Sequence, residues 1–164
     1  MSSSKLNIYN AVLVTLNAAK APGGQLAFVN NIYNNGFTTV GQISPNACPA
    51  IEVEPFSDSE EWFAAGVAPA LLSKFKVFVE CILYESSPGA GVIGDASQTP
   101  PVIGILEFMD RVKQVLQADM TLGGGLGMQK VSFPEAPIYY VQYPMRQAKI
   151  TVLLESQLAT NAHI

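Results

Sequence analysis

Five carboxylate side chains gather in a short stretch of the first half of the chain, and a tryptophan follows them. These residues are Glu52, Glu54, Asp58, Glu60, Glu61 and Trp62. Paired carboxylates serve acid–base catalysis when their surroundings separate their pKa values, and regularly placed carboxylate oxygens bind calcium. A calcium loop also needs a glycine at a fixed position, which this stretch lacks. Because runs of like charge usually face water, we interpret the group as a solvated acidic surface.

The side chains that most often carry catalysis are scarce. The single histidine, His163, is the last residue but one, and a catalytic histidine must be held in place by a third group. Cys48 and Cys81 have no partners at the spacing of zinc ligands. Cys81 falls among apolar residues of a predicted strand, where a thiol packs as a small hydrophobic group. The sequence therefore contains no recognisable set of catalytic residues, and we expect no enzyme activity, no metal and no cofactor.

A glycine-rich run at residues 123–127 has the composition of a phosphate-binding loop but not its context. Such a loop lies between a strand and the start of a helix, and Lys followed by Ser or Thr closes it. This run follows a predicted helix and lacks that closing pair. We interpret it as a flexible connection from the helix to the next strand.

The composition favours contacts with other protein chains. Hydrophobic residues make up 49% of the 164 residues and charged residues only 13%, which is about half the usual charged share. A small domain with so few charges has difficulty covering its whole surface with them. Homo-oligomerisation is therefore expected, with part of the apolar surface covered by neighbouring copies.

The balance of charge excludes other partners. The net charge is −4 and the isoelectric point is near 4.9, without a cluster of Lys and Arg, which argues against a surface that grips nucleic acid. No apolar run reaches the roughly 20 residues that span a membrane. The N-terminus also lacks the charged and apolar segments of a secretory signal. We expect synthesis in a cytosol and no membrane partner.

The rest of the chain is organised around one long strand at residues 72–86. Its side chains alternate between two faces, as the period of two in a strand requires. One face is apolar and consists of Phe75, Val77, Val79, Cys81 and Leu83. The other face is mixed and consists of Lys74, Lys76, Phe78, Glu80, Ile82 and Tyr84. The pattern predicts the central antiparallel strand of a sheet, with partial cover on its mixed face.

Before this strand, helical spacing of apolar residues predicts an amphipathic helix over residues 5–20. Strands are predicted at residues 25–33 and 37–43, and an edge strand at residues 51–54 that Pro55 stops. Glu52 and Glu54 share one face of that strand. The acidic residues 57–62 read as a capped turn of helix or a loop, because Ser57 stands three positions before Glu60.

After the central strand, residues 87–99 have the Gly, Ser and Pro content of an exposed loop. A second amphipathic helix is predicted over residues 102–116. Strands follow at residues 128–133, 138–143 and 147–155, and residues 156–164 are expected to form a flexible polar tail. The whole chain therefore predicts a single α+β domain, with a mostly antiparallel twisted sheet and two amphipathic helices packed on one face.

The order of these elements resembles the tail terminator proteins of long-tailed bacteriophages, which are also called tail completion or minor tail proteins. The resemblance covers residues 6–155. An acidic turn precedes the long strand FKVFVECILYES, and a Gly/Ser/Pro loop follows it. The best markers are the helix that ends in Thr121-Leu122-Gly123-Gly124 and the closing strand that begins near Arg146.

The resemblance implies a structural virion protein of the tail or neck, assembled in the host cytoplasm. Members of the family form a ring, commonly a hexamer, on the last layer of the tail tube. The ring stops polymerisation of the tube, joins the tail to the head-completion or neck proteins, and leaves a passage for DNA. Negative charge suits such a passage, because an acidic wall does not bind a moving polyanion.

Two surfaces are candidates for these contacts. The acidic group, residues 52–62, is a candidate lining of the passage or an interface. The loop after the central strand is a candidate contact with the next subunit or the neck, through Ser87, Pro88, Val92, Ile93 and Asp95. Two alternatives remain open. The chain is compatible with another head–tail connector or neck protein. It is also compatible with a non-viral, monomeric or dimeric α+β domain that binds a small apolar ligand or acts as an enzyme without a cofactor.

Overall fold

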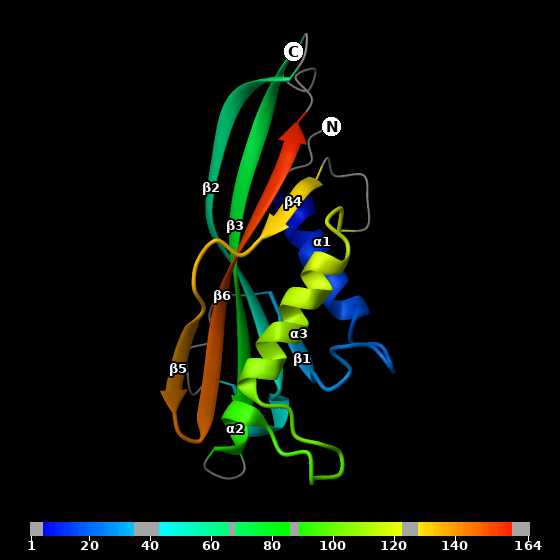
Figure 1. Ribbon diagram of the computed structural model, residues 1–164, viewed down its shortest axis with the longest axis vertical. Coiled ribbons are helices and arrows are strands. Elements are labelled where there is room, and N and C mark those ends of the chain that lie inside the picture. Colours follow the sequence, from blue (N-terminus) through cyan, green and yellow to red (C-terminus); the bar gives the residue numbers. More distant parts are fainter. Residues whose placement is uncertain (1–4, 35–42, 66–67, 86–88, 123–127, 159–164) are drawn as a thin grey trace.

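The computed structural model describes residues 5–34, 43–65, 68–85, 89–122 and 128–158. Within them the chain forms one α+β domain with a six-stranded sheet (Figure 1). The helices are α1 (Lys5–Ala18), α2 (Ala90–Ile93) and α3 (Ile105–Ala118), with a short 3-10 helix at Pro45–Ala47. The strands are β1 (Asn31–Tyr33), β2 (Ala50–Ala65), β3 (Ala68–Tyr84), β4 (Met128–Ser132), β5 (Ile138–Gln142) and β6 (Met145–Leu158).

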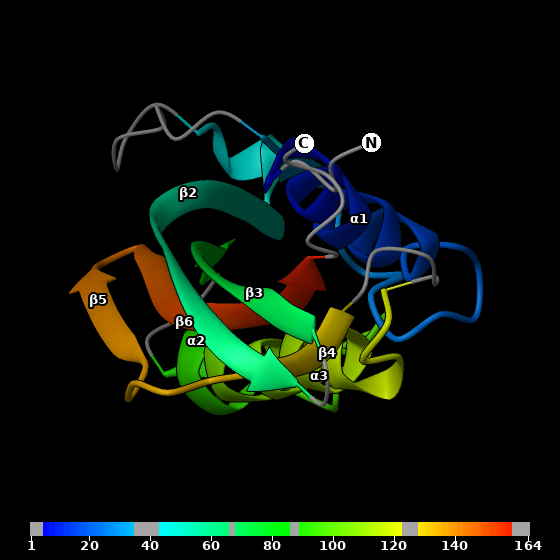
Figure 2. The same ribbon diagram turned by 90° about the horizontal axis from the view of Figure 1, so that it is seen from above.

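The sheet has the strand order β1-β2-β3-β6-β4. Strand β5 also pairs with β6, at residues 145–149 of β6, whereas β4 pairs with residues 153–156. All pairs are antiparallel except β1 with β2, which run parallel. The predicted central antiparallel strand is confirmed, because β3 lies between β2 and β6 along its length. Seen from above, the sheet is strongly curved, and β5 lies at the margin away from α1 (Figure 2).

The alternation predicted for the central strand is also confirmed. The whole apolar face of β3 is buried in one hydrophobic core, from Phe75 to Leu83. Inward side chains of β6 continue this face with Ala148, Ile150, Val152 and Leu154. On the mixed face most side chains are half-buried, as expected, and Ile82 is fully buried against Ala50 and Met145 in a second, smaller core.

The helices α1 and α3 bury their apolar stripes in the main core. Ile8, Val12 and Leu16 of α1 are fully buried, and so are Phe108, Val112 and Leu116 of α3. Phe28, which follows α1, packs edge-on against Phe108 with ring centroids 5.0 Å apart. The structure adds a helix that the sequence did not predict, because the one-turn α2 lies inside the segment expected to be a loop.

The predicted strand at residues 25–33 is wrong for its first half. Residues 25–28 form turns, and only Asn31–Tyr33 is a strand. Val29 donates its N–H to the carbonyl oxygen of Leu26 over 2.9 Å, which curves the backbone. Leu26 and Val29 both reach the core from this curved segment. Their apolar character therefore reflects burial at a turn. In the predicted strand at residues 37–43, only Ile43 belongs to the described residues.

The edge strand predicted at residues 51–54 is much longer in the structure. Strand β2 runs from Ala50 to Ala65 and passes Pro55 with a register shift between Pro55 and Ser57. A proline is tolerated there because a bulge does not need its N–H. The predicted helical turn or loop at residues 57–62 is wrong, since pairing with β3 overrides the local capping pattern. At residues 50–52, β2 is not an edge, because β1 covers it.

Two further boundaries differ from the prediction by three residues. Helix α3 begins at Ile105 and not at residue 102, because Val102 exchanges both backbone hydrogen bonds with Asp95 over 2.9 Å. Strand β6 continues to Leu158, and Ser156 is fully buried. The prediction that a flexible tail begins at residue 156 is therefore wrong for residues 156–158. Residues 159–164 lie outside the described part of the chain.

Candidate functional site

The acidic residues predicted as one group are spread along strand β2. Glu52 is buried, Glu54 is half-buried, and Asp58, Glu60 and Glu61 are exposed. A strand advances about 3.3 Å per residue, so the carboxylates from first to last span roughly 30 Å. They cannot act as a single centre. The side chain of Trp62 lies outside the described part of the structure.

Lysines balance much of the exposed acidic charge. Lys5 at the start of α1 pairs with Asp58 and lies 3.5 Å from a carboxylate oxygen of Glu60. Lys74 on the neighbouring strand lies 2.7 Å from Glu61. The hydrogen bond to Asp58 raises the pKa of Lys5, and the hydrogen bond to Glu61 raises the pKa of Lys74. The role of this group as a lining of a DNA passage stays a prediction.

The outer part of β2 has an unusual environment for a long strand. Every side chain from residue 55 to residue 61 is exposed, so both faces of this segment meet solvent. Among the described strands, β2 has β1 on its outer side only at residues 50–52. We call residues 55–61 the exposed segment of β2. Figure 1 shows it running with β3 beyond the level of α3.

The segment predicted as a contact loop is built around a buried ion pair. Arg146 of β6 lies 2.9 Å from Glu85, whose side chain is fully buried at the end of β3. The N–H of Gly91 in α2 donates to the same carboxylate oxygen over 3.0 Å. A Cβ at Gly91 would stand 2.6 Å from that oxygen, so any other residue at this position would displace the side chains of the ion pair. This pair positions α2, and no motif in the sequence indicates it.

The structure separates the predicted contact residues of this loop. Ile93 is 80% exposed, whereas Val92 and Asp95 are half-buried. Asp95 accepts hydrogen bonds from Ser97 and Gln98, and these bonds lower its pKa. Asp95 therefore shapes its own turn, and Ile93 is the residue that a partner could reach. Ser87 and Pro88 lie outside the described residues.

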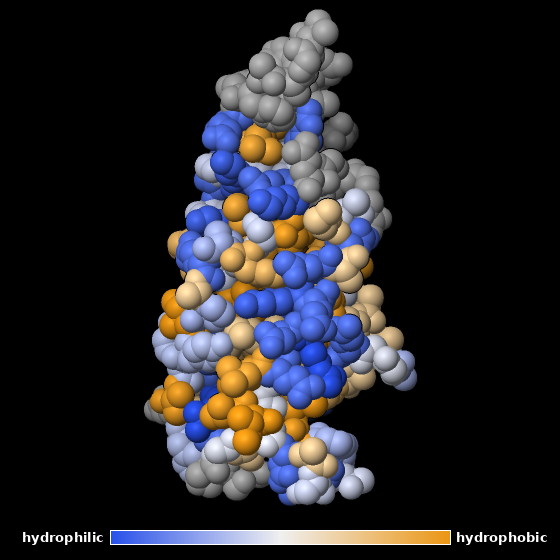
Figure 3. All heavy atoms as spheres, viewed as in Figure 1, coloured by the Kyte–Doolittle hydropathy of each residue, from blue (hydrophilic) through white to orange (hydrophobic). Residues whose placement is uncertain are grey.

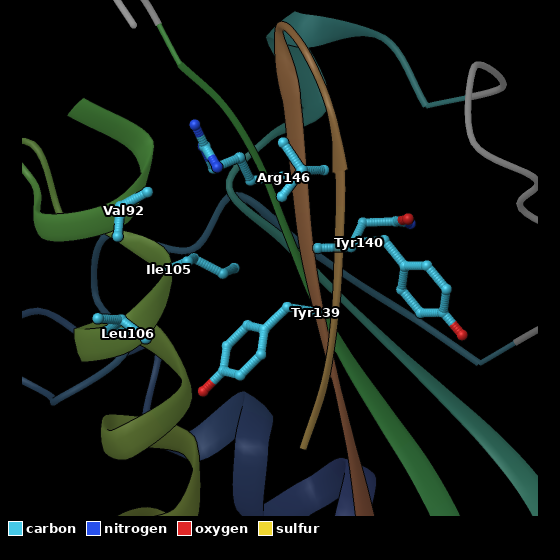
Figure 4. A pocket seen from close by; sticks show the side chains of 8 residues that line it. Val92, Ile105, Leu106, Tyr139, Tyr140 and Arg146 are labelled. Atoms are coloured by element: carbon cyan, nitrogen blue, oxygen red, sulfur yellow. The ribbon is translucent and has the colours of Figure 1, made fainter. Parts of the chain in front are cut away.

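A cavity of about 220 Å³ lies between β5 and the helices α2 and α3. Its lining is Val92, Ile105, Leu106, Tyr139, Tyr140, Val141, Arg146 and Gln147. Figure 4 shows Tyr139 reaching from β5 toward α3, and its hydroxyl lies 3.5 Å from the sulfur of Met109. The cavity is almost wholly apolar, so it suits a hydrophobic side chain or a small apolar molecule.

Among the strand side chains whose exposure is described, those of β5 expose the most apolar surface. Four of its side chains and one in the following turn are between 44% and 62% exposed, namely Ile138, Tyr139, Tyr140 and Val141 of the strand and Tyr143 of the turn. Figure 3 shows hydrophobic side chains gathered at the lower end of the molecule, where Figure 1 places β5 and α2. The sequence signal was the uncharged run IYYVQY. It predicted a strand, but not that the strand would remain uncovered.

Two classes of site are absent from the described residues. No helix there is both long enough and apolar enough to cross a membrane. No group of three or more His, Cys, Asp or Glu side chains in the same residues is placed to hold a metal ion.

No protein-family model and no curated protein sequence matches this chain. The residues themselves therefore carry the functional argument.

Proposed function

We propose that this chain is a structural virion protein that forms a ring at the end of a phage tail tube. Six copies are proposed, because the family that it resembles commonly forms hexamers. The ring terminates polymerisation of the tube and joins the tail to the head-completion or neck proteins. DNA passes through it without specific binding. The proposal rests on the resemblance in the order of elements, and the α+β fold with its long central strand is compatible with it.

The observation that carries the proposal is the exposed segment of β2. A strand normally buries at least one face against a core, because two exposed faces contribute little hydrophobic stabilisation. Seven consecutive residues of β2 instead expose both faces, although β3 pairs with them. A neighbouring copy that packs on this segment would supply the missing contacts. A chain with only 13% charged residues is suited to burying surface in this way.

The acidic side chains have a distinct role within this proposal. Asp58, Glu60 and Glu61 stand on the exposed segment, and their carboxylates would face either a neighbouring subunit or the DNA passage. The salt bridges to Lys5 and Lys74 favour an interface, because they lower the charge that a passage would present. Ile93 is the candidate contact with the next subunit or the neck.

Two measurements test the proposal. Native mass spectrometry of the purified chain should find a closed assembly of several copies, and electron microscopy should show a ring. Phage particles without the protein should then have tails of uncontrolled length that fail to join heads. A lone subunit at high concentration, together with normal tails in its absence, would refute the proposal.

Paired substitutions test the two candidate surfaces. Replacing Glu60 and Glu61 with Gln should alter ring formation or DNA delivery, while Glu107→Gln on α3 serves as a control with a similarly exposed carboxylate. Ile93→Ser should weaken joining to the neck without affecting the fold, because its side chain is 80% exposed. Normal assembly and infectivity of both variants would remove these residues from the interface.

The apolar cavity favours a second candidate function, the binding of a small apolar ligand. Its 220 Å³ would hold a molecule the size of one aromatic ring. Leu106→Trp should fill the cavity and abolish binding of a small aromatic probe, with Val14→Trp as the control on α1. If the probe does not bind the unmodified chain, this candidate is lost. Another head–tail connector or neck protein remains the alternative within the virion, and the tail-length measurement separates it from a terminator.

A further inference from the structure

Strand β5 is a sheet edge without a partner on its outer side among the described residues. It pairs only with β6, from Ile138 opposite Lys149 to Gln142 opposite Met145. In an antiparallel pair, alternate residues turn their N–H and C=O groups toward the neighbouring strand, and the others turn them away. The outward groups of β5 therefore form a row of donors and acceptors that can pair with another strand.

The edge lacks the features that keep natural edges from pairing. Charged side chains and prolines usually occupy such strands. The outer part of β2 has both, with Pro55 and the carboxylates of Asp58 and Glu60. From Ile138 to Tyr143 there is no charged residue and no proline. Of these two edges, only β5 is compatible with another copy of the same strand.

The exposed surface on β5 is large enough to contribute to a stable contact. Its aromatic and aliphatic side chains are about half exposed. An aromatic side chain buries about 150–250 Å² when fully covered, so five large side chains at this exposure offer on the order of 500 Å². A standard interface removes about 800 Å² from each partner. Val92 and Leu106, beside the cavity, are placed to supply part of the remainder.

The neighbouring charges disfavour a charged partner segment. Lys149 and Arg146 lie on β6, the strand that pairs with β5. Each of them forms a salt bridge with a carboxylate of its own chain. Lys149 lies 2.9 Å from Glu80, and Arg146 lies 2.9 Å from Glu85. An acidic peptide would therefore have to compete with Glu80 and Glu85 for these two cations, which are the ones described next to β5. An uncharged strand such as β5 itself would lose no ionic contact.

We propose that β5 pairs antiparallel with β5 of a second copy, about a two-fold axis at Tyr140. In this register Tyr140 faces Tyr140 of the other copy, and Tyr139 lies beside Val141 of the other copy. Tyr139 and Val141 share the face that borders the cavity, so each copy extends an apolar wall next to the cavity of the other. Aromatic and β-branched cross-strand pairs are among those that stabilise sheets.

This contact is separate from the proposed ring. A two-fold contact uses the same patch on both copies and joins them in pairs, whereas a ring needs a second, head-to-tail surface. Rings that persist when β5 is blocked would leave the proposed function standing. Pairs without rings would support the present inference and count against the ring.

Cross-linking tests the two-fold register directly. A single Tyr140→Cys variant should form a disulfide-linked dimer under mild oxidation, because the same position meets across the axis. The native cysteines do not interfere, since Cys48 is 8% exposed and Cys81 is fully buried. Val14→Cys is the control, because Val14 is 67% exposed on α1 and away from β5. If the Tyr140→Cys variant forms disulfide-linked dimers no faster than the Val14→Cys variant, the proposal is overturned.

A charge exchange gives a second, independent test. Tyr140→Glu and Tyr140→Lys should each abolish pairing in native mass spectrometry, because like charges then meet at the axis. An equimolar mixture of the two should restore a dimer that contains one copy of each. Circular dichroism should show that both variants keep the fold, since Tyr140 is 44% exposed. Unchanged pairing of the single variants, or no mixed dimer, overturns the proposal.

Discussion

Arg146 donates a hydrogen bond from Nε to Oε2 of Glu85 over 2.9 Å, and the Glu85 side chain is completely buried. The N–H of Gly91 donates to the same oxygen. One carboxylate thus joins the end of β3, the start of β6 and the short helix α2. Helix α2 has only four residues and too few internal hydrogen bonds to be stable alone. Its position therefore depends on this contact.

The first prediction is that Arg146→Met strongly destabilises the fold and displaces α2. The substitution keeps an unbranched apolar stem but leaves a buried carboxylate without its cation, which is among the costliest single changes. The urea midpoint should fall well below that of Lys130→Met, whose ion pair with Glu155 is long and whose side chain is 62% exposed. Hydrogen exchange should also increase in α2. Equal midpoints for the two variants would contradict this role of Arg146.

The second prediction concerns pH. The hydrogen bond from Arg146, with a further one from the Gly91 N–H, lowers the pKa of Glu85 below its ordinary value of 4.5, although burial opposes the shift. A lowered pKa in the folded state stabilises the protein above pH 4.5, and this contribution is lost as the pH falls toward the folded value. The gap in melting temperature between the unmodified chain and Arg146→Met should therefore narrow below pH 4.5. A constant gap would contradict the assignment.

The third prediction is a moderate loss of stability in Tyr9→Phe. The Tyr9 hydroxyl lies 2.7 Å from the carbonyl oxygen of Val53 and 2.9 Å from that of Asn34, so it joins α1 to β2. Removing one such hydrogen bond costs about 1 kcal/mol. Urea unfolding of Tyr9→Phe should show this loss, and Tyr143→Phe, with a side chain 58% exposed, should not.

The fourth prediction addresses the main core. Phe108 is fully buried and packs edge-on against Phe28, so Phe108→Ala leaves a cavity between α3 and the segment after α1. Large-to-small substitutions of this kind cost about 3–5 kcal/mol. Leu106→Ala on the same helix removes a side chain that is 41% exposed and should cost about 0.5 kcal/mol. Calorimetry of the two variants measures the difference, and similar losses would contradict the packing.

The fifth prediction is that neither thiol reacts in the folded protein. Burial raises the pKa of Cys48 to about 11, and it also raises the pKa of the fully buried Cys81. Only the thiolate is nucleophilic, and at a pH three units below the Cys48 pKa it makes up about 0.1% of that residue. Alkylation near pH 8 followed by mass spectrometry should label both residues only after unfolding. Rapid labelling of the native chain would contradict their burial.

Local patterns were sufficient for the elements that carry a strong period. The alternation from Phe75 to Leu83 identified β3 as a strand and correctly separated its buried face from its mixed one. The helical stripe that includes Met109, Val112 and Leu116 identified α3, with its start misplaced by three residues. Such patterns are reliable because burial of one face selects the same residues in any arrangement of the sheet.

Local patterns misled where a distant partner decided the conformation. Ser57 and Glu60 form a capping pattern and Pro55 breaks strands, yet β2 continues because β3 offers a ladder of hydrogen bonds along its length. Helix α2 was missed because its position depends on the ion pair between Glu85, just before the helix, and Arg146, which is 61 residues further along the chain. Neither partner could be assigned from spacing alone.

The sequence by itself determined the α+β class, the central position of β3 and the scarcity of groups for catalysis. Composition and hydrophobic period express these properties locally, residue by residue. Only the tertiary structure decided that Glu52 would be buried while Asp58 and Glu60 remain exposed, and that Tyr139 and Val141 would stand at an open sheet edge. Burial and strand pairing depend on segments far apart in the chain, so they follow from the completed sheet and not from any single stretch.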